Sequence, residues 1–262
     1  MQNRGFDLSL NYRIWQKKDN FFSVFASVSH NKNKVRKIND ALKAFNDTQD
    51  AEASTLPIIR YEEGQSMTAI WAVQSLGIDP ATGTELFLKK DGVTKTYNYT
   101  TDDYIIAGDS NPKYRGNFGF NGEYRGFGLS CTFTYRTGAD YYNQTLVNRV
   151  ENVNIAHNVD RRVFSETWQQ VGDVAKYKHI SSYPSTTYAT TRFVEREHVL
   201  DFASLSAYYD FKHCHWLRKL KMERLRLQFY MNDVFHASTI KAERGLDYPY
   251  AHTFAFSLSA TF

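Results

Sequence analysis

Polar and apolar residues alternate with a period of two along several stretches of this chain. Near its beginning, apolar side chains occupy every second position: Phe6, Leu8, Leu10, Tyr12 and Ile14. A short polar turn follows at 17–20, and the alternation resumes over 22–28. Because successive side chains of a strand point to opposite faces, the pattern predicts a β-hairpin with one apolar and one mostly polar face.

Segments of the same kind recur to the end of the chain. Their apolar positions are Phe118 and Phe120; Phe127, Leu129, Cys131, Phe133 and Tyr135; Val199, Ala203, Leu205, Ala207, Tyr209 and Phe211; Leu225, Leu227, Phe229 and Met231; and Tyr250, His252, Phe254, Phe256, Leu258, Ala260 and Phe262. They run to roughly 10–13 residues, which is long for globular strands and suits strands that cross a membrane at a tilt. With the less regular segments 65–74 and 85–89, the sequence predicts an all-β fold of about nine strands.

The connections between these segments alternate in length. Short ones lie near 17–20, 75–82, 125–126 and 212–219, and long polar ones cover about 32–63, 90–111, 138–196 and 233–248. Outer-membrane barrels join their strands by short periplasmic turns and long extracellular loops. An antiparallel transmembrane β-barrel portion with long extracellular loops is therefore predicted. Nine strands are an odd number, and an open set would leave two unpaired edges in lipid, so we expect a part of a larger barrel.

Composition leaves one alternative open. Aromatic residues make up 16% of the chain, yet the mean hydropathy of -0.53 is that of a polar protein. This combination suits strands with one wet face, and it would also suit a soluble β-sandwich carbohydrate-binding module. Strand length, the sorting of the loops and the terminal Phe262 favour the barrel.

Other classes of function find little support. The 32 basic and 28 acidic residues are interspersed, and no basic stripe with stacking aromatics recurs, so we expect no nucleic-acid partner. His213, Cys214 and His215 are adjacent, which turns their side chains to opposite sides of an extended chain, so we expect a surface turn and no metal site. The histidines are scattered without a Ser–His–acid spacing, so we expect neither an enzyme nor a cofactor.

Several short motifs, in this order along the chain, resemble those of SusC/RagA-type TonB-dependent outer-membrane transporters. They are Glu63–Met67 with Gly77–Gly83 (EGQSM and GIDPATG), Gly108–Lys113 (GDSNPK), Phe127–Ser130 (FGLS), Trp168 with Gly172 and Asp173, Arg192–Glu195 (RFVE) with Leu200–Tyr209, and the terminal strand Phe254–Phe262. Gly128 stands where the family usually has Asp, and Asp201 and Ala203 also depart from its pattern. Asp79-Pro80 with Thr82-Gly83 is turn chemistry in its own right, because Pro presets φ and Gly accepts a positive φ.

The resemblance implies a fold and a function. Members of this family import oligosaccharides or peptides through a 22-stranded barrel with a plug, using energy relayed by the TonB complex, and a SusD-like surface lipoprotein closes the extracellular mouth. The matched motifs imply that residues 1–262 are the C-terminal part of such a barrel. No signal peptide opens the chain, and we expect the plug and the N-terminal strands to be absent, so that the fragment would not transport alone. The implied location is the outer membrane of a Gram-negative bacterium.

Two groups of residues are candidates for functional contacts. Aromatic residues in the longest predicted loop, Tyr141, Tyr142 and Trp168 with Tyr177 and Tyr183, would stack on sugar rings or pack against the lid lipoprotein. They would equally pack the loop onto itself. At the C-terminus, the resemblance implies that Phe254, Phe256, Leu258 and Phe262 mark the chain for the barrel insertion machinery and then face the lipid bilayer. The alternation by itself predicts only a strand. The substrate is not specified by any of these residues.

Overall fold

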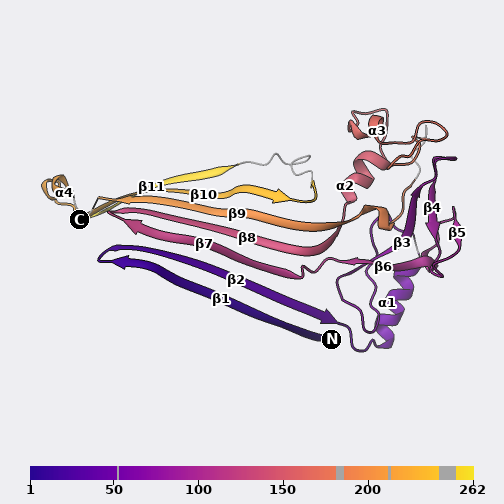
Figure 1. The fold of residues 1–262 in the computed structure, drawn as a ribbon, viewed down its shortest axis with the longest axis horizontal. Helices are drawn as coiled ribbons and strands as arrows, with labels where there is room; N and C mark the ends of the chain where they lie inside the picture. Colours follow the sequence, from indigo (N-terminus) through magenta and orange to yellow (C-terminus); the bar gives the residue numbers. More distant parts are fainter. Residues whose placement is uncertain (52, 181–185, 212–213, 242–251) are drawn as a thin grey trace. The chain divides into compact units, whose positions relative to one another are not determined.

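The computed structural model describes residues 1–262 apart from 52, 181–185, 212–213 and 242–251. The chain divides into two compact units, and several long strands have residues in both of them (Figure 1). The strand unit comprises Gly5–Asn31, Pro112–Gly138 and Glu197–Phe262. The loop unit comprises Met1–Arg4, Lys32–Asn111 and Ala139–Arg196. Each unit is described on its own below.

Seven long strands form one sheet in the order β1-β2-β7-β8-β9-β10-β11. Their bounds are β1 Gln2–Lys17, β2 Asn20–Lys34, β7 Tyr114–Tyr124, β8 Phe127–Tyr142, β9 Val194–Asp210, β10 Arg224–Ser238 and β11 Thr253–Thr261. Every pair of these strands whose register is defined runs antiparallel. Lengths range from 9 residues in β11 to 17 in β9. The prediction of an antiparallel all-β fold with unusually long strands is therefore confirmed.

Tight turns join the first hairpins, as the polar residues between the apolar runs predict. Arg125 and Gly126 link β7 to β8 with φ angles of 51° and 86°. Two successive residues with positive φ form the type I′ turn, whose twist matches that of the flanking strands. Lys18, between β1 and β2, also has a positive φ of 53°. A short helix, α4 (His215–Lys219), lies in the connection between β9 and β10.

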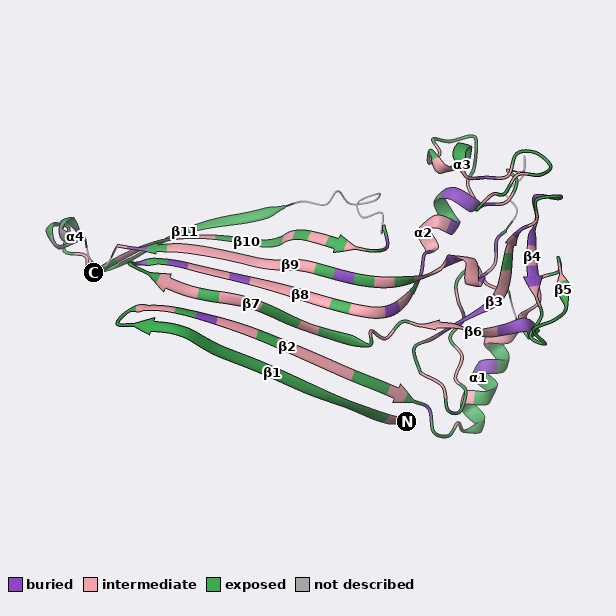
Figure 2. Ribbon diagram, viewed as in Figure 1, coloured by how far each residue is buried: buried purple, intermediate pink, exposed green. Residues whose placement is uncertain are grey.

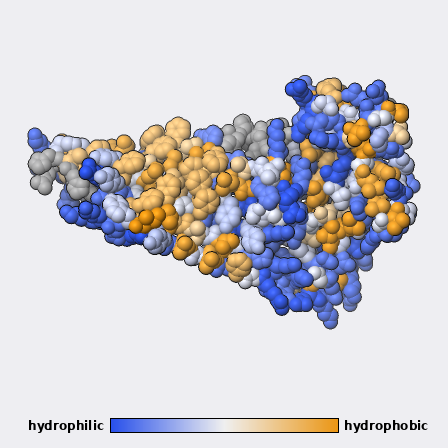
Figure 3. Space-filling view, in the orientation of Figure 1, coloured by the Kyte–Doolittle hydropathy of each residue, from blue (hydrophilic) through white to orange (hydrophobic). Residues whose placement is uncertain are grey.

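The register gives the long sheet one apolar and one polar face. Across β10, Leu227 pairs with Leu258 on one side and Tyr209 on the other, whereas Gln228 pairs with Ser257 and Tyr208. Aromatic rings continue the apolar face across the middle of the sheet, where Phe133 stacks on Phe202 with ring centroids 4.4 Å apart. In the space-filling view, hydrophobic side chains gather in a band over these strands (Figure 3). Residues directly opposite each other on paired strands point to the same face of the sheet, so apolar and polar positions match from one strand to the next.

The two edge strands of this sheet are the most exposed. β1 and β11 are exposed along almost their whole lengths (Figure 2). On β11 the exposed fractions of Phe254, Phe256 and Leu258 are 63%, 68% and 68%. Lipid does not tolerate unpaired backbone groups, so such edges would need further strands in a membrane; that this chain is part of a larger barrel stays a prediction.

The loop unit has a sheet and cores of its own. Four shorter strands are arranged in the order β5-β4-β3-β6. Their bounds are β3 Ala69–Ile78, β4 Glu85–Leu88, β5 Lys95–Thr96 and β6 Tyr104–Asp109. The helical segments are α1 Asp40–Asp50, η1 Thr101–Asp103, α2 Gln144–Leu146, η2 Val147–Glu151, α3 Arg162–Ser165 and η3 Thr191–Phe193. No helix in the described part of the chain is long and apolar enough to cross a membrane, a finding that concerns helices alone.

Two buried clusters hold the loop unit together. One gathers Tyr142, Val147, Val150, Val163 and Phe193 with neighbouring side chains, and the other gathers Ile58, Trp71, Val73, Phe87 and Tyr104. Contiguous clusters of buried apolar side chains are the hydrophobic core of a folded unit. The long connections are therefore packed structures and not extended polar loops.

The predicted number of nine barrel strands is wrong. β2 pairs directly with β7, through Phe21–Ser29 and Arg115–Glu123, so the predicted strands 65–74 and 85–89 cannot lie between them in the long sheet. They correspond to β3 and β4 of the smaller sheet. The reason is visible in β3, where four consecutive residues, Ile70–Val73, are all buried. A strand that meets lipid on one face and water on the other does not bury consecutive side chains. The join near 75–82 is accordingly a turn of this smaller sheet.

Candidate functional site

Tyr141 and Tyr142 at the end of β8 have opposite environments. Tyr142 is only 9% exposed, its ring packs edge-on against Phe193 at 6.0 Å, and its hydroxyl donates a hydrogen bond to the Thr55 carbonyl oxygen at 3.3 Å. The neighbouring Tyr141 is 39% exposed. Adjacent strand residues point to opposite sides, which explains the difference. Tyr142 thus packs the loop unit onto itself, and Tyr141 is the member of the pair with a ring accessible to a ligand.

Trp168 fastens its loop to the turn that follows β3. Its indole nitrogen donates to the Pro80 carbonyl oxygen at 3.0 Å, and its ring lies against Gly83, where an added Cβ would approach within 2.5 Å. Backbone bonds reinforce the contact, from Gly172 N to Pro80 O at 2.9 Å and from His179 N to Gly83 O at 3.0 Å. Two of the motifs that resemble the transporter family, GIDPATG and the loop with Trp168 and Gly172-Asp173, therefore pack against each other.

The turn itself forms as its sequence predicts. Asp79 accepts hydrogen bonds from the backbone nitrogen of Ala81 at 2.9 Å and from the hydroxyl of Tyr97 at 2.5 Å, and Gly83 takes a φ of 70°. The bond from Tyr97 is the main reason why the pKa of the Asp79 carboxyl lies below its ordinary value. A charged acceptor and a glycine with positive φ together fix the turn that Trp168 covers.

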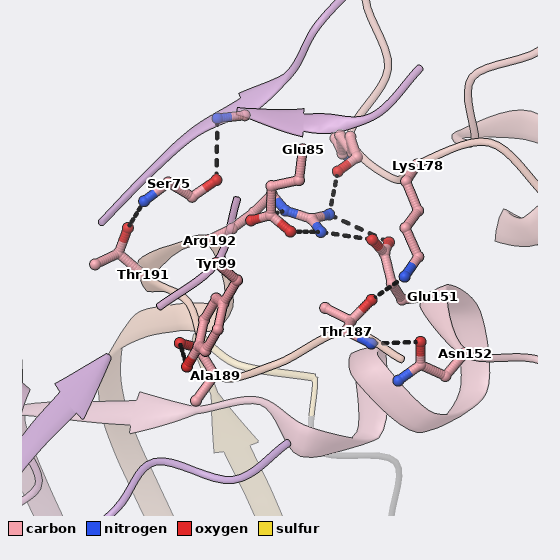
Figure 4. Close-up of polar contacts among 12 residues, drawn as sticks. Ser75, Glu85, Tyr99, Glu151, Asn152, Lys178, Thr187, Ala189, Thr191 and Arg192 are labelled. Atoms are coloured by element: carbon pink, nitrogen blue, oxygen red, sulfur yellow. Dashed lines mark hydrogen bonds and ion pairs between the residues drawn. The ribbon is translucent and has the colours of Figure 1, made fainter. Parts of the chain in front are cut away.

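A buried guanidinium organises the other side of the loop unit. Arg192 lies between two carboxylates, with Nη2 at 2.9 Å from Glu85 Oε2 and 2.5 Å from Glu151 Oε1 (Figure 4). Burial opposes the charge on Arg192, but the carboxylates of Glu85 and Glu151 more than offset that effect and raise its pKa above the ordinary value. Nη1 also donates to the Lys176 carbonyl oxygen at 2.7 Å. One residue thus joins β4, η2 and the loop before η3.

A second layer of polar contacts surrounds this group (Figure 4). Lys178 contacts the Thr187 hydroxyl, and burial lowers the pKa of its ammonium group. The Thr187 backbone nitrogen donates to Asn152 Oδ1 at 3.1 Å, and the Ser75 nitrogen donates to the Thr191 hydroxyl at 3.0 Å. Tyr99 donates to the Ala189 carbonyl oxygen at 3.4 Å, and burial raises the pKa of its phenol. Segments distant in sequence are therefore held in one rigid frame.

A polar hollow opens on the loop that carries Trp168. It has a volume of about 370 Å³ and is lined mainly by polar side chains and backbone of 165–176. Glu166 forms an ion pair with Lys176 at 3.0 Å, and Asp173 accepts bonds from the backbone nitrogens of Gln169 and Gln170 at 3.1 Å and 2.9 Å. Such a surface offers hydrogen bonds and charge to a polar solute.

The other predicted site residues have different surroundings. Tyr177 is buried, and Tyr183 lies outside the described residues, as does His213 of the predicted surface turn. Phe254, Phe256 and Leu258 lie in β11 on the apolar face, opposite Met231, Phe229 and Leu227, and Phe262 follows the strand with 80% exposure. Their role in assembly stays a prediction. Among the residues that the structure describes, no group of three or more His, Cys, Asp or Glu side chains could hold a metal ion.

Comparison with known proteins adds the following findings. No family model matches the chain. The TonB-dependent receptor P3 of Formosa agariphila is 25% identical over 162 residues, which are 56% of this chain and 16% of the receptor. The structure of the RagAB peptide transporter matches with a TM-score of 0.71 and 20% identity, over 92% of this chain and 26% of that chain. The RagAB peptide importer in the closed-closed state gives a TM-score of 0.69 at 20% identity, over 91% and 26%.

This chain resembles a part of a SusC/RagA-like TonB-dependent transporter. The sequence comparison gives a receptor of the TonB-dependent class, and the structural comparison gives the fold. The chain spans about a quarter of the length of the RagA-like chains that it matches. The solved structures that it resembles are those of a peptide transporter and a peptide importer.

The buried ion network is the feature that sequence reasoning missed. Arg192 lies within the RFVE motif, so the motif marked the position but gave no sign of its partners Glu85 and Glu151. The exposed Tyr141 and the polar hollow on loop 165–176 are the surfaces of the loop unit with features suited to a solute.

Proposed function

We propose that this chain is a barrel segment of an outer-membrane TonB-dependent importer of oligosaccharides or peptides in a Gram-negative bacterium. The observation that carries the proposal is the register of the long sheet, in which strands of 9 to 17 residues keep an apolar and a polar face. Long strands with continuous two-sided alternation suit a wall between lipid and a water-filled lumen. A soluble β-sandwich would cover its apolar face with a second sheet.

In such a wall the two ends have different tasks. Short turns such as Arg125-Gly126 would face the periplasm, and the long connections between strands would be extracellular. The ion network around Arg192 would hold the loop unit rigid enough to shape an entrance. Tyr141 and the hollow on loop 165–176 would meet the solute, because an aromatic ring stacks on sugars or peptide side chains and the hollow supplies polar groups.

The whole importer needs more than this segment. A plug, a TonB-contacting segment and further strands would complete the barrel, so the segment alone would not transport. A SusD-like surface lipoprotein would cover the extracellular side, in line with the two-component RagAB structures that the chain resembles. Affinity purification of the protein from outer membranes should therefore recover a lipoprotein in near-equal amount.

Fractionation and uptake test the proposal together. The protein should be found in the outer-membrane fraction, and deletion of its gene should abolish growth on a defined oligosaccharide or oligopeptide that passes no porin. Recovery of the protein in the soluble fraction would refute the membrane function. Growth unchanged on every such substrate would refute the importer while leaving the barrel intact.

A pair of matched substitutions tests the solute contact. Tyr141→Ala should raise the half-saturating concentration for uptake by about 2- to 10-fold, as expected for the loss of one aromatic contact. Tyr12→Ala removes an even more exposed tyrosine ring from β1, on the side that would meet lipid, and should leave uptake unchanged. Equal effects of the two substitutions would remove Tyr141 from the site.

A further inference from the structure

The strand unit contains an apolar cavity of about 250 Å³ close to its tight turns. Rings and one aliphatic side chain supply most of its wall: Trp15, Phe22, Phe120, Tyr124, Phe127 and Leu129. Its residues come from β1, β2, β7 and β8, and β2, β7 and β8 are hydrogen-bonded neighbours. The cavity is thus built on paired strands and not on a mobile connection.

Gly122 creates the hollow. It pairs with Phe22 on β2 and Leu129 on β8, so all three positions share the apolar face of the sheet. Large side chains surround a position that has none. A Cβ at this position would lie 2.9 Å from the Phe21 carbonyl oxygen and 3.0 Å from a ring carbon of Phe22, so the close backbone itself excludes a larger residue.

Exposed basic side chains follow two of the wall residues along the chain. Lys17 ends β1 two residues after Trp15, Lys18 lies in the next turn, and Arg125 follows Tyr124 in the turn between β7 and β8. The guanidinium of Arg125 lies 5.3 Å from the centre of the Tyr124 ring. Within the described part of the chain, no ion pair joins these three groups to an acidic side chain. Glu123, the acidic residue in the wall, already accepts a hydrogen bond from the Tyr208 hydroxyl at 2.6 Å. Three basic residues and one acidic residue, Asp19, therefore lie in or beside the two turns next to the apolar hollow, so positive charge is in excess there.

We propose that this cavity binds an anionic phospholipid. A segment of one acyl chain would fill the hollow around Gly122, and Lys18 and Arg125 would contact the phosphate. The pairing of an aromatic-lined apolar surface with basic side chains is the chemistry that recognises anionic lipid at a membrane interface. Because Phe22, Gly122 and Leu129 of its wall share the apolar face, the inference rests on the proposed membrane-spanning function.

Variants that change the charge or the hollow test the inference separately. Lys18→Asn with Arg125→Asn removes both charges, and asparagine tolerates the positive φ of these positions. Leu129→Trp enlarges a wall side chain and occupies the hollow. Leu227→Trp makes the same change on the apolar face of β10, away from the cavity, and is the control.

The measurement uses the whole protein, extracted from outer membranes into detergent and stripped of lipid. Native mass spectrometry then follows the binding of phosphatidylglycerol and of phosphatidylethanolamine with the same acyl chains. The unchanged protein should bind phosphatidylglycerol at least about tenfold more tightly. Lys18→Asn with Arg125→Asn should abolish that preference, Leu129→Trp should weaken binding of both lipids, and Leu227→Trp should change neither.

The outcomes separate the two proposals. A protein that is absent from the outer membrane contradicts the proposed function, and the lipid site with it. A membrane-embedded protein that binds both lipids equally, or whose preference survives the removal of Lys18 and Arg125, overturns the lipid site alone. Loss of binding in Leu227→Trp as strong as in Leu129→Trp would also overturn it, because the cavity would then have no special part.

Discussion

Replacement of Arg192 by alanine removes the guanidinium that two buried carboxylates share. The exposed fractions of the side chains are 12% for Arg192, 7% for Glu85 and 0% for Glu151. Breaking a buried ion pair by removing one partner costs about 3–5 kcal/mol, because the remaining charge is left in a poorly solvated place. Here four hydrogen bonds to two carboxylates are lost together. We therefore expect destabilisation of the loop unit at the upper end of that range.

Hydrogen exchange measured peptide by peptide on the purified protein is the appropriate assay. Each loss of about 1.4 kcal/mol in stability lowers the protection factor about tenfold. Protection of the amides in 147–151 and 187–193 should therefore fall by roughly 100-fold or more, while the amides of the strand unit exchange as before. Arg192→Lys should recover only part of the protection, because an ammonium group cannot form the paired bonds of a guanidinium.

Two further variants make this prediction decisive. Lys176→Ala breaks an ion pair in the same loop whose lysine is 75% exposed, and it should cost less than about 1 kcal/mol. Arg192→Met combined with Glu85→Gln and Glu151→Gln removes all three charges and should regain stability relative to Arg192→Ala. Unchanged exchange in Arg192→Ala, or an equal effect of Lys176→Ala, would show that the buried network does not hold the loop unit.

Four other predictions follow from the structure. The chain expressed alone should aggregate and require detergent or denaturant, and a monodisperse soluble monomer with cooperative unfolding would contradict the membrane assignment. A cysteine that replaces Gln228 in the assembled barrel should react with a water-soluble maleimide. A cysteine that replaces Phe229 should react only with a lipid-soluble probe. The opposite result would show that the polar and apolar faces are assigned wrongly. Transfer of the exposed Phe262 ring into lipid would contribute roughly 1.5–3 kcal/mol. Phe262→Ala should nevertheless sharply lower the amount of barrel in the membrane without changing its heat resistance. Normal amounts with lowered heat resistance would show that Phe262 is a packing residue. Gly83→Ala should loosen the turn at 79–84, because the added Cβ would lie 2.5 Å from the Trp168 ring and the residue has a φ of 70°. If the rate of proteolysis at that turn did not change, the packing described would be contradicted.

The long strands could be predicted from the sequence because their pattern is local. Phe118 and Phe120 alternate with Asn117 and Asn121, and the pairing of Phe118 with Phe133 preserves the same alternation on the next strand. In a wall one strand thick, each side chain meets one of two environments, so two-residue periodicity carries nearly all the information. The turn at Arg125-Gly126 is equally local, since it depends on a φ that glycine accepts.

The loop unit could be predicted only in part, because its order depends on distant contacts. β3 is recognisable as a strand, but its consecutive buried residues gave no indication of which strands it pairs with. Arg192 and Glu85 are separated by 107 positions, and Arg192 and Glu151 by 41, so no spacing connects them. A local sign was overlooked in α1, where Asn39 caps the helix by accepting a bond from Leu42 N at 3.0 Å. Asparagine before a short amphipathic run is a usual start of a helix.

The direct pairing of β2 with β7 has a consequence for how such proteins diverge. Residues 35–113 leave the long sheet after β2 and return to it at the adjacent strand, so the whole smaller sheet is an insertion between two neighbours. Exchange of this insertion between related genes would keep the register of Phe21–Ser29 with Arg115–Glu123, but Glu85 and Gly83 inside it would still have to match Arg192 and Trp168 outside it. We therefore expect residues 35–113 and 139–196 to change together in related proteins, and the paired strands of the long sheet to change more slowly.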